Sequence, residues 1–294
     1  MVVRQKKDGI PPVLLYSTMG GIVAFLTVVF AVRSMVISDP LPRCGTRYAN
    51  ATIFPLRQAN GGLMRSADIQ AKLLERDWGL EKNGRITELS GAPANAVLQV
   101  ALPAGRAPEN SREMPPSGVG FKWVAGFFEQ ASSACMSYSV WVPSDFDYGA
   151  GGVLPSLYGG RPGGAAENAR PYFAARLHWQ NGGKLGVQVA ATRSLPIRTY
   201  GLGEGSFRLP RGRWVAIEQE VILNTPDKPN GELRIWVDGE LQLHHKSVEL
   251  RAKDKFGFAG VWADMHYAAS GSLAWAPAPK SSSLAITPII VRWH

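Results

Sequence analysis

The chain has 294 residues, of which 45% are hydrophobic and 19% are charged, so it can bury a full core without bound metals or many disulfides. The formal net charge is +9; four basic residues and one acid among the first 33 account for +3, which leaves +6 for the remainder. This charge favours acidic polysaccharide, lipid headgroups or acidic protein surfaces as partners, although a mildly basic solvated surface would give the same count. We recognise no nucleic-acid-binding motif and expect no nucleic-acid partner.

The N-terminal region contains an uncharged run, Val13–Val32. A helix with this number of residues is long enough to cross a hydrocarbon core of about 30 Å, so we expect a single transmembrane helix over 13–33. A cleaved signal peptide is the alternative, but no small-x-small cleavage pattern follows closely. Basic residues precede the run, so the positive-inside rule predicts a cytoplasmic tail over 1–12. The remainder would then lie in the periplasm or outside the cell, held by an uncleaved signal anchor.

Residues 34–94 read as a connector rich in Pro, Gly and Asn that contains one short helix. Ser66 is a candidate cap for this helix, Asp68 lies in its first turn, and Trp78 marks its end. We expect the helix to pack on the domain that follows.

The chain has two cysteines, Cys44 and Cys135, which would lie in an oxidising compartment if the predicted topology holds. They could form one disulfide that ties the connector to the domain. Alternatively, Cys135 is a buried thiol within an apolar strand. The sequence leaves both possibilities open.

Residues 95–294 show a period of two in short runs separated by Gly, Pro, Asn and Asp, which is typical of an all-β domain. Asp238 and Gly239 predict a tight hairpin, and Asn181–Gly183 predicts a slightly longer one. We therefore expect a two-sheet antiparallel jelly-roll sandwich of the concanavalin-like type. The predicted strands are 96–102, 119–128, 134–142, 172–179, 184–191, 213–223, 232–237, 241–245 and 284–293.

Alternation assigns the two faces of one predicted hairpin. Phe173, Ala175, Leu177 and Trp179 point to the core on the first strand, as Leu185, Val187 and Val189 do on the second. The opposite face carries Arg176 and His178 beside Lys184, Gly186, Gln188 and Ala190. On another strand, Trp236 is expected to face outward, which makes it the best candidate for stacking against a sugar.

Four stretches carry a resemblance to polysaccharide lyase family 14 and related jelly-roll lyases of uronic-acid polymers. They are ACMSYSVWVPSDFDYGAGGVLPSLYGG (134–160), FAARLHW (173–179), LPRGRWVAIEQEVILNTPDKPNGELRIWVDGE (209–240) and AWAPAPK (274–280). The resemblance implies β-elimination on a uronate, which needs a group that neutralises the carboxylate, a base and an acid.

The resemblance also implies a Lys, a Ser, an Arg and two Tyr at defined places, and most of them are substituted. The lysine would stand at Val153 and the serine at Ala174, whereas the arginine is retained as Arg176. The two tyrosines would stand near Gln188 and Ala190, and a register slip of one would not restore them. The usual proton-transfer groups are therefore missing.

We weigh three functions on this basis. The first is a membrane-anchored lyase-like domain that binds an anionic polysaccharide with weak or no cleavage, through Arg176, Lys184, Gln188 and Trp236. The second is a non-catalytic accessory subunit of a membrane protein complex, a pseudoenzyme. The third is an active uronate lyase with rewired chemistry, in which Arg176 holds the carboxylate and His178 accepts the proton. No cofactor and no metal site is expected, because no metal-ligand spacing is found and His244 and His245 point to opposite faces.

Overall fold

The computed structural model describes residues 41–73, 77–105, 117–124, 130–160, 173–191, 197–251 and 257–294, together with Phe25 and Thr27. The predicted transmembrane segment, 13–33, lies outside the described residues apart from those two. Within the part that is described, no helix is long and apolar enough to cross a membrane. Pro42–His294 forms one compact unit and Met1–Leu41 another.

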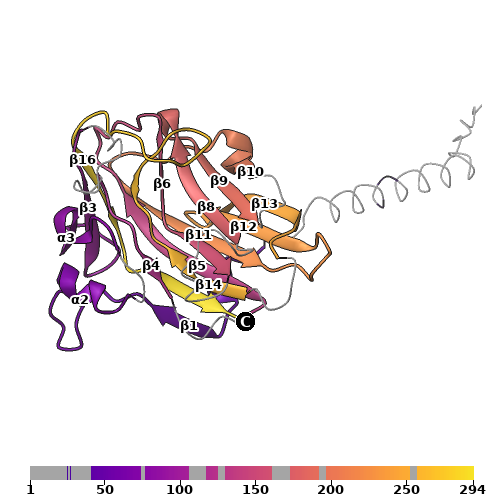
Figure 1. The fold of residues 1–294 in the computed structure, drawn as a ribbon. Coiled ribbons are helices and arrows are strands. Elements are labelled where there is room, and N and C mark those ends of the chain that lie inside the picture. The colour runs from indigo at the N-terminus through magenta and orange to yellow at the C-terminus, as the bar shows by residue number, and fades with distance from the viewer. Residues whose placement is uncertain are drawn as a thin grey trace, which may run out of the picture. The chain divides into compact units, whose positions relative to one another are not determined.

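The unit Pro42–His294 is built from two antiparallel β-sheets, as the sequence predicts (Figure 1). The larger sheet runs in the order β13-β12-β11-β5-β16-β3-β2, with β1 and β17 paired beside this path. Its strands are β1 (Asn50–Ile53), β2 (Gly84–Thr87), β3 (Val97–Leu102), β5 (Ser133–Trp141), β11 (Trp214–Ile222), β12 (Gly231–Val237), β13 (Glu240–Val248), β16 (Ser282–Ile286) and β17 (Ile290–Trp293).

The smaller sheet runs in the order β10-β9-β8-β7-β14-β4, with β6 and β15 paired beside this path. Its strands are β4 (Lys122–Trp123), β6 (Gly151–Val153), β7 (Ser156–Gly160), β8 (Phe173–Gln180), β9 (Leu185–Ala191), β10 (Arg198–Gly201), β14 (Gly257–Trp262) and β15 (His266–Tyr267). The described helices are all short: η1 (Cys44–Thr46), α2 (Ser66–Gln70), α3 (Leu80–Asn83), η2 (Asn181–Gly183) and η3 (Leu202–Gly205).

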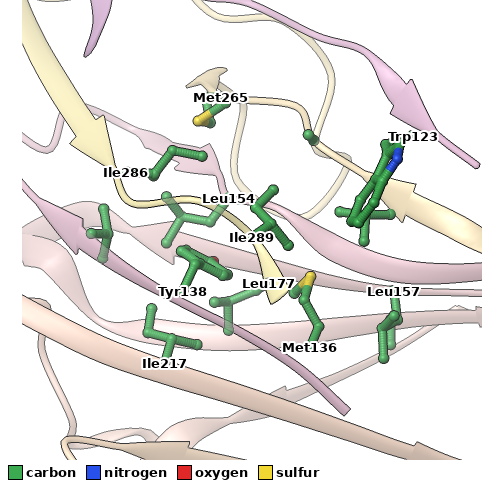
Figure 2. Close-up of a cluster of buried hydrophobic side chains, with 14 of the residues drawn as sticks. Trp123, Met136, Tyr138, Leu154, Leu157, Leu177, Ile217, Met265, Ile286 and Ile289 are labelled. Carbon is green, nitrogen blue, oxygen red and sulfur yellow. The ribbon is translucent and has the colours of Figure 1, made fainter. Parts of the chain in front are cut away.

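The space between the sheets holds the hydrophobic core (Figure 2). Tyr138 from β5 and Ile217 from β11 lie there with Leu177 from β8 and Leu157 from β7, and all four are buried. Burial of apolar surface at this interface is the main stabilising contribution to the fold.

Both predicted hairpins are present. Asp238 and Gly239 connect β12 to β13 with positive φ angles of 50° and 86°, the conformation that favours a two-residue hairpin turn. The Asn181–Gly183 turn connects β8 to β9, again with glycines at positive φ. The register of both hairpins follows from these turns.

Some strands differ from the prediction. The run 284–293 divides into β16 and β17, because Pro288 has no N–H to donate to the ladder. The sequence prediction missed β7 and β14, whose residues are buried on both faces apart from Trp262 and therefore lack polar alternation. Residues 34–94, predicted as a connector, contribute β1 and β2 to the larger sheet.

The short predicted helix begins at Ser66 but is not capped by it. Arg65 is the residue before the first turn, and its backbone N–H donates to the Asp68 carboxylate at 2.8 Å. The Ser66 hydroxyl donates instead to the carbonyl of Gly84. The helix ends at Gln70, before the predicted end at Trp78.

Cys44 and Cys135 form a disulfide, so the first of the two possibilities is the one observed. Cys44 lies in η1 and Cys135 in β5, and both are buried. The bond therefore fixes the start of the compact unit on the outer face of the larger sheet.

Candidate functional site

The residues predicted to share a face of the β8–β9 hairpin do so. Arg176 lies opposite Gln188, and His178 lies opposite Gly186, in an antiparallel register. Val153 on β6 pairs with His178 on one side and with His266 of β15 on the other. Directly opposed residues have side chains on the same face, so these strands together form one polar surface, which we call the site face.

Arg176 is only 9% exposed, and its neighbours include Asp264 and Trp262. Its Nη2 donates to Oδ2 of Asp264 at 2.8 Å. Its Cζ also lies 4.0 Å from the centre of the Trp262 ring, a cation–π distance. The guanidinium is therefore fixed in position, and a ligand carboxylate would have to compete with Asp264 for it.

His178 is buried and has neighbours at both ring nitrogens. Nδ1 lies 3.3 Å from the carbonyl oxygen of Arg176, and Nε2 lies 3.3 Å from the amide nitrogen of Gln180. With its proton on Nδ1, the ring donates to that carbonyl and accepts from Gln180. Burial lowers the pKa of His178, and the Arg176 charge lowers it further. The imidazole is therefore neutral at pH 7, but accepting a proton would cost it the Gln180 bond.

Other segments cover part of the site face. The ring of Trp275 stacks on His266 at 3.9 Å between centroids, and Trp78 packs edge-on against both rings. The Gln188 amide donates to the carbonyl of Gly271 at 2.7 Å. The loop from 268 to 275 thus contacts the site face on both sides, at His266 of β15 and at Gln188 of β9.

Lys184 and Trp236 differ from the rest of the predicted site. Lys184 is exposed and lies just before β9, at the turn end of the hairpin. Trp236 faces away from the inter-sheet core as predicted, but it is 1% exposed. It is packed with Cys44, Cys135 and Tyr48, so the prediction that it is an exposed stacking surface was wrong. Alternation predicts on which face of the sheet a side chain lies. It does not predict whether a segment distant in sequence buries that side chain.

The positions that the family resemblance assigns to catalysis offer no proton-transfer group. Val153 is 0% exposed, and Ala174 is also buried, beside Tyr158 and Ala259. Gln188 holds the covering loop. Of the expected set, only Arg176 has a side chain that can bind a carboxylate.

Three residues of the site were missed by sequence reasoning: Trp262, Asp264 and His266. They lie in or after β14, a strand without polar alternation, so no periodic signal placed them beside Arg176. Burial lowers the pKa of His266.

Cys44, Cys135 and Glu218 are close enough together to bind a metal, but the two sulfurs are bonded to each other and are not available as ligands.

Taken together, the fold and the site face define a jelly-roll sandwich with a buried arginine on one sheet. The family model of polysaccharide lyase 14 matches residues 91–284, so the chain belongs to the polysaccharide lyase 14 family. A comparison with curated proteins finds no match.

Solved structures share this fold. The PL-14 alginate lyase from Aplysia kurodai is 17% identical with a TM-score of 0.66, and the alignment covers 84% of this chain and 99% of that one. Alginate lyase vAL-1 from Chlorella virus is 16% identical with a TM-score of 0.61, covering 83% and 100%. The endo-β-1,4-glucuronan lyase from the fungus Trichoderma reesei is 12% identical with a TM-score of 0.55, covering 84% and 96%. At these identities the likeness shows the fold alone.

Proposed function

We propose that this protein is a membrane-anchored, extracytoplasmic lyase-like domain that binds an anionic polysaccharide of the uronate type, with weak or no cleavage. Membership of the polysaccharide lyase 14 family supports the class of ligand. The solved structures of similar fold include an alginate lyase and a glucuronan lyase. Both polymers consist of uronates, which supports a uronate polymer as the ligand. The uncharged run Val13–Val32 supports the anchor.

One observation carries the proposal: the site face keeps a fixed guanidinium, whereas the lysine, serine and tyrosines that the resemblance implies for catalysis are substituted. Arg176 can bind a carboxylate through paired N–H donors. Elimination also requires removal of a proton from the sugar and protonation of the leaving oxygen. Val153 and Ala174 supply neither, and both nitrogens of His178 already have neighbours. The site face can therefore still bind a uronate carboxylate through Arg176, whereas cleavage would need proton-transfer groups other than those of the family.

A second candidate is a non-catalytic accessory subunit of a membrane complex. The burial of Arg176, its ion pair with Asp264 and the loop held by Gln188 favour it, because they limit access of a long polymer to the site face. In this role the site face would serve stability, and another surface would contact the partner.

The two candidates are separated by measuring polysaccharide binding. The full chain in detergent micelles is titrated with alginate and with glucuronan by calorimetry, while absorbance of unsaturated uronate is followed in parallel. Arg176→Ala is compared with Arg85→Ala, which removes an exposed arginine from β2 in the larger sheet.

We expect binding in the wild type and in Arg85→Ala, a loss of at least tenfold in Arg176→Ala, and little or no product. Rapid product formation that Arg176→Ala abolishes would instead establish an active lyase. Absence of binding to any uronate polymer would leave the accessory subunit as the remaining candidate.

A further inference from the structure

A cluster of three exposed cations lies at the turn end of the β8–β9 hairpin. Lys184 and Arg208 oppose each other in an isolated antiparallel bridge, and Arg211 follows three residues later in the chain. Lys184 continues the alternation of Gly186 and Gln188, so it extends the site face toward this end. We call Lys184, Arg208 and Arg211 the basic cluster.

The charge of the basic cluster is not explained by ion pairing. Like charges that oppose each other directly across two strands are destabilising. Within the described part of the chain, none of the three cations forms an ion pair with a carboxylate. Two other cations do form ion pairs: Arg213 Nη1 lies 2.7 Å from Oδ2 of Asp238, and Lys280 Nζ lies 2.7 Å from Oδ2 of Asp145. Asp145 also interacts electrostatically with Arg211, so the basic cluster retains its positive charge mainly at Lys184 and Arg208.

The two arginines of the cluster are held in place. Arg208 Nη1 donates to the carbonyl of Gly182 at 2.6 Å, and Arg211 Cζ lies 4.5 Å from the centre of the Tyr148 ring. Tyr148 is itself buried, and its hydroxyl donates to the carbonyl of Leu209. Side chains that are already ordered lose less conformational entropy when a ligand binds.

The glycines of the turn make this arrangement possible. A Cβ on Gly182 would lie 2.7 Å from Arg208 Nη1, and a Cβ on Gly183 would lie 2.6 Å from Cζ of Tyr148. Both glycines also have positive φ. A larger residue at Gly182 would therefore displace the Arg208 guanidinium, and one at Gly183 would displace the Tyr148 ring.

We propose that the basic cluster is an outer subsite for the carboxylates of an anionic polysaccharide whose chain also occupies the site face. This proposal rests on the proposed function and extends it to a second point of contact. Guanidinium groups suit carboxylates because their planar donors match both oxygens. Three cations from two separate segments suit a polymer with repeated charges better than one small anion.

The test compares two triple variants of the full chain in detergent micelles. One is Lys184→Gln, Arg208→Gln and Arg211→Gln; the control is Lys72→Gln, Lys82→Gln and Arg85→Gln, which removes three exposed cations elsewhere. Affinity for alginate oligosaccharides of increasing length is measured at low and at physiological salt. We expect the cluster variant to bind long oligosaccharides about tenfold more weakly than the control, with a smaller salt dependence. Short oligosaccharides should bind both variants equally.

Equal affinities of the two variants for long chains would overturn the proposal. If the wild type binds no uronate polymer, dextran sulfate serves as the probe: binding lost only in the cluster variant would keep the cluster as a polyanion site while the proposed function fails. Binding to phosphatidylglycerol vesicles that only the cluster variant loses, with unchanged alginate binding, would assign the cluster to the membrane and overturn the polysaccharide subsite.

Discussion

The side-chain amide of Gln219, on β11 of the larger sheet, donates a 2.7 Å hydrogen bond to the carbonyl of Ala175, on β8 of the smaller sheet. Its Oε1 accepts from the backbone N–H of Leu157, also at 2.7 Å. The β8 ladder is irregular here: His178 pairs with Val153 and Ala174 pairs with Tyr158, so residues 154–157 face only 175–177. Gln219 thus satisfies backbone groups that a bulge leaves without ladder partners, next to Arg176.

Replacing Gln219 by leucine should destabilise the fold. The buried carbonyl of Ala175 and the N–H of Leu157 would both lose their partner, and each unsatisfied group costs about 1–3 kcal/mol. We expect the free energy of unfolding, measured with urea, to fall by about 2–4 kcal/mol. Gln99→Leu, on the outer face of β3, is the control and should change it by less than about 1 kcal/mol. A Gln219→Leu protein as stable as the control would show that the bulge does not need this side chain.

Asp264→Asn should separate stability from binding. The substitution removes the charge that neutralises the buried Arg176, and loss of one partner of a buried ion pair costs about 3 kcal/mol or more. At the same time a ligand carboxylate no longer competes with Asp264. We therefore expect a lower melting temperature together with a severalfold higher affinity for uronate oligosaccharides. Weaker binding by a folded Asp264→Asn protein would mean that Asp264 positions Arg176 for the ligand rather than occupying it.

The free energy of unfolding should decrease as the pH falls below 6.5. Burial lowers the pKa of His178 and His266 from the ordinary value of 6.5 in the folded state. Below 6.5 the unfolded chain therefore binds protons that the folded chain does not, so acid favours unfolding. Well above 6.5 both rings are neutral in both states, and this contribution to the pH dependence disappears.

Urea titrations between pH 7.5 and 5.5 measure this effect. The double variant His178→Gln, His266→Phe should show a much flatter profile, with a residual slope from His245, whose pKa burial also lowers. His294→Gln, at the exposed C-terminal residue, should keep the wild-type slope. A slope that is the same in all three proteins would assign the pH dependence to other groups.

Removal of the Cys44–Cys135 disulfide should loosen the start of the compact unit. The two cysteines are 91 residues apart, and closing a loop of this length stabilises a fold by about 4.6 kcal/mol in the chain-entropy account. We expect the Cys44→Ser, Cys135→Ser protein to lose about 2–4 kcal/mol of unfolding free energy. Quenching of tryptophan fluorescence by acrylamide should rise in the variant and not in a variant that also carries Trp236→Phe. Unchanged quenching would show that the cover over Trp236 persists without the bond.

The sequence determined the all-β fold, the two hairpins and the faces of β8 and β9. These features depend on local rules: alternation directs each side chain, and turn residues with positive φ set the register. For that reason Arg176, His178 and Gln188 could be placed together from their spacing alone. The substitutions at Val153 and Ala174 were identified instead from the family resemblance.

Only the tertiary structure decided what covers those faces. Asp264 is 88 residues from Arg176 in the chain. Cys44 in η1 packs with Trp236 in β12, although many strands lie between them in the chain. Such contacts arise because distant segments are brought together by burial of the common core, and no local period encodes them. The same reason explains why β7 and β14, buried on both faces, escaped prediction. Whether a polar side chain is a free ligand or an internal ion pair is therefore fixed by packing.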